Sequence, residues 1–123
     1  MNPNTLLHRQ VSPGFIHNGQ VSSQVFRPTP KDENKLSVYN GDLITAEKAY
    51  NHFCKQLNYN SVGVMAVTQA ECASQSLSVV EDKIPFPEHC HINFEGLSKS
   101  QVEKKAKYLK SYAESRGWQF RPE

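Results

Sequence analysis

The chain has 123 residues, of which 37% are hydrophobic and 21% are charged, and its formal net charge is +2. This length fits one domain, and the composition is typical of a small soluble globule with a modest core, which excludes a disordered chain and a coiled coil. A net charge this small does not by itself indicate nucleic-acid binding.

Three features of the chain indicate its compartment. The longest apolar run, Val62 to Val67, is far shorter than a bilayer-spanning segment. The N-terminal residues lack a basic flank followed by an apolar run of signal-peptide length. The cysteines are odd in number, widely spaced and without a CxxC pattern, so free thiols are expected at Cys54, Cys72 and Cys90. We therefore expect a cytoplasmic protein with no membrane segment.

The first third of the chain predicts short strands and turns. A first strand is expected over Leu6–Val11, followed by a tight turn at the Asn18-Gly19 pair. Val21–Phe26 and Leu36–Tyr39 predict a strand on each side of the polar segment Arg27–Lys35. Two prolines in that segment remove backbone donors and indicate a sheet edge or a loop.

The middle of the chain predicts a helix, a strand and a second helix. Thr45 is a candidate N-cap, and apolar residues recur at helical spacing over residues 45–57. The valine-rich run from Ser61 to Thr68 is typical of a strand buried on both faces, which favours a central position in the sheet. Thr68 and Glu71 match a capping box that starts a short helix over residues 69–76.

The last third predicts two more strands and the longest helix. The strands are expected over Leu77–Val80 and His89–Phe94. Ser98 and Gln101 form a second capping box, and apolar residues line one face of a helix over residues 99–116. The element order predicts a single α+β domain over residues 1–123. Its small mixed sheet would carry two main helices, about 45–57 and 99–116, packed on one face, with a short helix near 69–76.

The polar segment Arg27–Lys35 is the first candidate site, because polar groups beside a rigid scaffold are where small proteins usually bind. Acids and bases alternate along it, so the net field is small, which favours a protein partner over nucleic acid. An alternative interpretation is a charged edge that blocks aggregation between strands. The predicted binding residues are Ser22, Ser23, Arg27, Lys31 and Lys35.

The enzymatic alternative combines Arg9, Ser22 and Glu88. In this chain order they match the ingredients of an ADP-ribosyltransferase-like site, in which the Arg grips the dinucleotide, the Ser supports the pocket and the Glu polarises the ribose. These residue types are common and their spacing is not diagnostic, so surface charges and polar strand positions explain them more simply. The chain has no Gly-rich phosphate loop, GxSxG elbow or HExxH motif, and no cofactor is predicted.

His89 and His91 are the candidate metal ligands. Alternate residues of a strand share a face, so both rings would point to one side while Cys90 points to the other. Zinc needs three or four such ligands, and no spacing identifies the rest, so an ordinary strand is favoured and no metal is predicted. The same alternation keeps both rings from the Cys90 thiol, which argues against a cysteine nucleophile.

A third hypothesis is that the protein binds nucleic acid through its basic C-terminal helix. Its lysines, with aromatic residues among them, would suit a phosphate backbone and stacked bases. At 100° per residue, however, they spread over most of the polar arc, which favours a solvated helix face. The candidate residues are Lys104, Lys105, Lys107 and Lys110.

Four segments also carry a resemblance to other proteins: Leu7–Gln10, Ser22–Glu33, Lys35–Tyr39 and Gly96–Gln101. Over most of its length the chain resembles a small family of uncharacterised bacterial proteins with no assigned activity. The resemblance implies a bacterial, intracellular, single-domain protein and carries over no functional residue. The favoured hypothesis is a non-catalytic module that binds a protein partner as an accessory part of a larger bacterial intracellular system, and whether it is an enzyme stays open.

Overall fold

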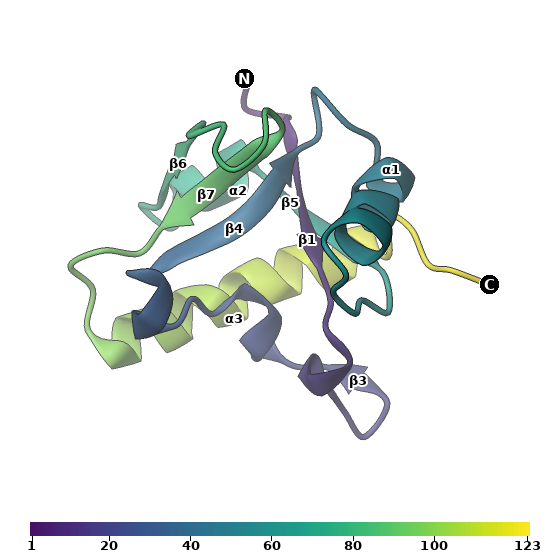
Figure 1. Cartoon of the computed structure of the whole chain (residues 1–123). Coiled ribbons are helices and arrows are strands. Elements are labelled where there is room, and N and C mark those ends of the chain that lie inside the picture. Colours follow the sequence, from purple (N-terminus) through teal and green to yellow (C-terminus); the bar gives the residue numbers. More distant parts are fainter.

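A five-stranded sheet with the strand order β5-β1-β4-β7-β6 forms the centre of the fold (Figure 1). The computed structural model describes residues 1–123 and confirms the predicted α+β class. A separate two-stranded hairpin, β2 (Ile16–His17) and β3 (Gln20–Val21), lies beside it. The strands of the main sheet are β1 (Leu6–Gln10), β4 (Lys35–Asn40), β5 (Val64–Thr68), β6 (Ser78–Val80) and β7 (His89–Asn93).

All neighbouring strands of the main sheet are antiparallel, so the prediction of a mixed sheet is wrong. A parallel pair needs a crossover that returns the chain beside the strand it has just left. Here the helix after β4 leads to β5, but these two strands flank β1 and do not pair with each other. No helix in the chain therefore joins two neighbouring strands.

The valine-rich strand β5 lies at an edge of the sheet, and the prediction that it is central is also wrong. Val64, Met65, Ala66 and Val67 are nevertheless all buried. Met65 and Val67 lie in the main core, and at the outer edge the Val64 backbone N–H donates to the Phe120 carbonyl at 2.8 Å in an isolated bridge with the C-terminal tail. The tail thus covers an edge that would otherwise expose unpaired backbone groups.

The three predicted helix starts are confirmed by their capping contacts. The first helix, α1 (Ala46–Asn51), begins where the Thr45 side chain accepts from the Lys48 N–H, and it continues into a π-helical turn, η4 (His52–Gln56). Both predicted capping boxes are complete, at the starts of α2 (Gln69–Ser74) and α3 (Lys99–Arg116). No helix combines the length and the apolar content that crossing a membrane requires.

The two main helices lie on opposite faces of the sheet, not on one face as predicted. On one face, Leu7, Val38 and Ile92 belong to the main core together with the buried residues of α3. Tyr39 points to the other face, where its hydroxyl is 2.8 Å from Nδ1 of His52 in η4. In Figure 1, α3 passes behind β1 while α1 lies on the near side. The prediction failed because both faces of the central strands carry side chains that need cover.

The strand predicted over Val21–Phe26 is wrong, and its pairing with Leu36–Tyr39 does not form. Residues Ser23–Phe26 instead make a short 3-10 helix, η2, in which Val25 and Phe26 are both fully buried. A strand would have directed the two side chains to opposite sides, whereas in η2 both lie in the core that α3 also lines. The predicted turn at Asn18-Gly19 is confirmed, with positive φ at both residues, and it closes the β2–β3 hairpin.

Replacement of Gly63 by alanine should detach the C-terminal tail from β5. Gly63 has φ +154°, and a Cβ there would lie 2.7 Å from the Phe120 carbonyl and 2.9 Å from the Trp118 ring. We expect Gly63→Ala to lower the free energy of unfolding by about 1–3 kcal/mol. Denaturant unfolding followed by Trp118 fluorescence measures the loss.

Gly14→Ala is the matched control for this test. A Cβ at Gly14 would meet only the Ser12 hydroxyl, at 4.0 Å. Its effect should stay within about 0.5 kcal/mol. Equal effects of the two substitutions would contradict the close approach of the tail to β5.

Candidate binding site

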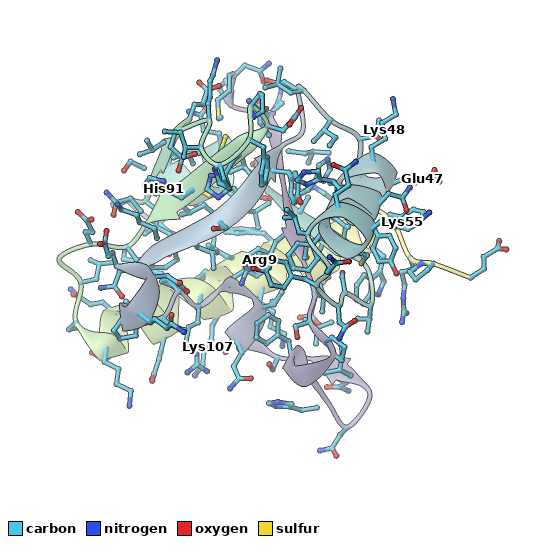
Figure 2. The ribbon with its side chains drawn as sticks, viewed as in Figure 1. Arg9, Glu47, Lys48, Lys55, His91 and Lys107 are labelled. Atoms are coloured by element: carbon cyan, nitrogen blue, oxygen red, sulfur yellow. The ribbon has the colours of Figure 1, made fainter.

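Strands β1 and β4 separate after a short stretch of pairing, and Arg9 fills the gap. The two strands pair only at Leu7 with Asn40 and at His8 with Tyr39. Beyond this point the Arg9 side chain bridges them: Nε donates to the Val25 carbonyl at 2.7 Å and Nη1 donates to the Ser37 carbonyl at 3.0 Å. One guanidinium therefore joins β1, β4 and η2, and Figure 2 shows Arg9 between the diverging strands.

A cavity of about 700 Å³ lies beside Arg9. Its walls come from η2, the following turn η3 (Pro30–Asp32), the first residues of β4 and the first turn of α3. Six lining residues are charged, with four cations against two carboxylates, which leaves an excess of two positive charges. They are Arg9, Arg27, Lys35, Lys99, Asp32 and Glu103.

Three of these six charges lie in ion pairs within the protein, namely Arg27, Glu103 and Lys35. Nη1 of Arg27 is 3.8 Å from Glu103, and Nζ of Lys35 is 3.1 Å from Glu33, both in partly exposed pairs of the kind that contribute little to stability. Arg9 and Lys99 form no ion pair. The cavity is therefore electrostatically prepared for an anion.

Arg9 keeps its charge at neutral pH despite its burial. Loss of hydration lowers the pKa of Arg9 to about 10, and the negative charge of Asp32 opposes that shift. Burial of a guanidinium without a carboxylate partner costs free energy. Here hydrogen bonds to two backbone carbonyls replace part of the lost hydration.

The polar groups of the lining are charged side chains, hydroxyls and amides. No histidine or cysteine is among them, so no nucleophile lies beside a ring base. The carboxylate of Asp32 accepts from the Thr29 hydroxyl at 2.7 Å, and the carboxylate of Glu103 faces Arg27. The arrangement offers cationic donors for an anion.

Arg27 and Lys35 are the predicted binding residues that line the cavity; Ser22, Ser23 and Lys31 do not line it. The Ser23 hydroxyl lies 3.5 Å from Nη2 of Arg27, and the Ser22 hydroxyl is buried without a partner. Lys99 was missed as a site residue. The available signal was the capping box at Ser98, which places Lys99 in the exposed first turn of a helix.

The predicted catalytic residues are not gathered in this cavity. Arg9 lines it, but Ser22 and Glu88 do not. Glu88 lies at the other end of β4 from the cavity residue Lys35, because its carbonyl accepts from the N–H of Asn40, the last residue of the strand, at 2.8 Å. Arg9 contacts β4 at Ser37, three positions earlier in the strand.

The opposite face of the sheet carries most of the histidines. His89 and His91 share this face, and their Nδ1 atoms lie 2.6 and 2.8 Å from the two oxygens of Asp82. Burial acts to raise the pKa of Asp82, but the hydrogen bonds from both rings outweigh it and lower the pKa. No group of three or more potential ligands in the chain is arranged to hold a metal ion. Cys90 lies in the main core, where burial raises the pKa of its thiol to about 11.

The lysines of α3 do not form one ridge. Lys104 and Lys107 are exposed, whereas Lys105 donates to the Gln75 carbonyl and Lys110 pairs with Glu114 at 3.3 Å. Two of the four candidates for nucleic-acid contact are therefore engaged within the protein.

No protein-family model matches this chain, and neither a curated protein nor a solved structure matches it.

Loss of the Arg9 guanidinium should weaken the fold. Arg9→Met removes donors from the Val25 and Ser37 carbonyls, so we expect a loss of about 2–4 kcal/mol in the free energy of unfolding. Urea denaturation measures it. Lys107→Met is the control, because this exposed side chain forms no hydrogen bond or ion pair, and its effect should stay within about 0.5 kcal/mol. An Arg9→Met variant as stable as the wild type would refute the bridging role.

His8 should make the fold sensitive to mild acid. It is only 4% exposed, its Nδ1 has no hydrogen-bond partner, and burial lowers its pKa from 6.5 to about 4. The unfolded chain therefore takes up a proton at a higher pH than the folded protein. The contribution of a neutral His8 is complete above about pH 6.5 and is lost as the pH falls toward 4. That loss is on the order of 3 kcal/mol.

Unfolding curves measured between pH 7.5 and 4 in about half-unit steps test the role of His8. The wild type should lose stability more steeply than His8→Gln over this window. His17→Gln, at an exposed histidine, is the control and should follow the wild type. Glu71 and Asp82 have lowered pKa values, so every variant loses stability at the acid end of the range. The difference between the wild-type and His8→Gln curves therefore reports the contribution of His8 alone. Parallel curves for wild type and His8→Gln would count against the buried neutral histidine.

Proposed function

We propose that the protein is a non-catalytic binding module that holds a segment of a protein partner in the cavity beside Arg9. The observation that supports this proposal most is the lining of the cavity, which combines an excess of positive charge with apolar walls. The earlier resemblance adds the proposed setting, an accessory role in a larger bacterial intracellular system.

The segment Arg27–Lys35 supports this proposal by its position. It supplies much of one wall of the cavity, including Arg27, Pro28, Thr29 and Pro30. Its two prolines and its short 3-10 turn restrict the backbone, so less conformational entropy is lost when a ligand orders the wall. A restricted, polar wall opposite the first turn of a long helix is suited to holding a peptide segment.

The other two functions have less support. An ADP-ribosyltransferase-like site needs Arg9, Ser22 and Glu88 around one ligand, and the cavity lining includes only Arg9. A nucleic-acid interface on α3 needs its lysines free, and Lys105 and Lys110 contact groups of the protein. The cavity, in contrast, is lined by residues of the predicted binding segment Arg27–Lys35.

Site-specific crosslinking in the native host tests the proposal. A benzophenone amino acid at Gln24, an exposed residue of the cavity lining, should yield a discrete protein adduct on irradiation. The same group at Tyr59, which is 60% exposed and outside the lining, is the positional control and should not yield it. The double substitution Arg27→Ala/Lys99→Ala should remove most of the Gln24 adduct. Identical adducts from both positions, or an adduct that the double substitution leaves unchanged, would refute the cavity as the binding site.

A further inference from the structure

We infer that the group recognised in the cavity is a carboxylate of the partner, an Asp or Glu side chain or a C-terminal carboxylate, bound by Arg9 with help from Arg27 and Lys99. This inference rests on the proposed function and specifies the chemistry of its ligand. It follows from the unused donors of Arg9, the limited excess of positive charge and the shape of the walls.

Arg9 is a fixed cation with unused donors. Nε and Nη1 are held by two carbonyl oxygens, and Nη2 donates to no group of the protein. A guanidinium has five N–H groups in one plane, so the end that carries Nη2 remains available as a fork for two oxygens. Because η2 and β4 hold the side chain in place, a ligand would find the fork already oriented.

Arg27 also has unused hydrogen-bonding capacity. Its Nε is buried without a partner, and its Nη1 reaches Glu103 only at 3.8 Å. A buried donor without an acceptor costs free energy, which an incoming oxygen would recover. Lys99 is the third cation, and it forms no ion pair. It lies at the start of α3, where the helix dipole also favours an anion.

The charge balance favours a single negative charge. Asp32 and Glu103 line the same cavity as the four cations, and Lys35 pairs with Glu33 at 3.1 Å, so the local excess is one positive charge. A carboxylate is accommodated by such a balance, whereas the dianionic form of a phosphate would lie in the same volume as both acids. No Gly-rich loop of backbone N–H groups is present to hold a phosphate.

The walls favour a peptide over a nucleotide. The apolar lining consists of side chains that suit an aliphatic stem and an extended backbone, namely Phe15, Pro28, Pro30, Leu36, Leu97 and Val102. The one aromatic ring among them, Phe15, already has the Arg9 guanidinium 5.9 Å from its centroid. That contact places a cation over the only aromatic surface on which a base could stack.

Two random-peptide display libraries test the inference on the full chain. One presents free C-termini and the other presents internal segments, so the two sources of a carboxylate are separated. We expect one or both to enrich an acidic group at a fixed position. Fluorescence anisotropy then measures the affinity of the enriched peptide, and its Glu→Gln version or its C-terminal amide should bind at least about tenfold more weakly.

Matched variants locate the binding. Arg27→Ala and Lys99→Ala should each weaken the peptide by at least about fivefold, because each removes one lining cation. Lys107→Ala, on the same helix as Lys99, and Lys48→Ala, on α1, should change affinity by less than about twofold. Figure 2 labels both control lysines, which lie outside the cavity lining. Arg9 is left intact in these assays because its loss alters the fold.

The outcomes separate this inference from the proposed function. Enriched peptides that lack an acidic group, or a phosphoserine version that binds about tenfold tighter than the Glu version, would overturn the carboxylate and leave a peptide-binding module. Recovery of no peptide would overturn the inference and leave the proposed function to the crosslinking result. Direct binding of ADP, lost in Arg27→Ala, together with no crosslinked partner, would overturn both.

Discussion

The rest of the structure depends on one partly buried cation between two strands that stop pairing. Strands β1 and β4 share only two residue pairs, and the Arg9 guanidinium then takes over their connection through the Val25 and Ser37 carbonyls. The separation of the strands opens room beneath η2, and the same cation lines the cavity that results. The fold and the candidate site therefore share one interaction.

The two faces of the sheet are covered by different kinds of side chains. The α3 face is an aliphatic core in which close packing of side chains such as Leu7, Ile92 and Leu109 supplies the stability. The α1 face is smaller and more polar, with Tyr39 bonded to His52 and with Asp82 holding His89 and His91. On this face His8 is buried with its Nδ1 unpartnered, and loss of hydration disfavours its protonated form and lowers its pKa.

Local signals in the sequence predicted the helices well and the sheet poorly. Capping depends on residues three positions apart, so Thr45, Thr68 and Ser98 marked the helix starts correctly. The position of β5 depended on Phe120, more than fifty residues away, which no local pattern contains. Val25 and Phe26 have strand propensity, but both side chains belong to the core that α3 lines, and a strand would have directed them to opposite sides. Part of the site was predicted for a similar reason: Arg27 and Lys35 lie in the polar segment, whereas Arg9 and Lys99 reach the cavity only through tertiary structure.

A structural cation that also lines a cavity has a consequence for recognition. Arg9 is desolvated and oriented when the protein folds, because the Val25 and Ser37 carbonyls hold the guanidinium before any ligand arrives. Ligand binding therefore does not include that free-energy cost. A ligand that completes its hydrogen bonds therefore gains their energy without the entropy loss of ordering a long side chain. Arg27 and Lys99, which are less constrained, would still lose that entropy on binding. Selectivity in this cavity should accordingly follow from the fixed guanidinium of Arg9, and Arg27 and Lys99 should add affinity at a larger entropic cost.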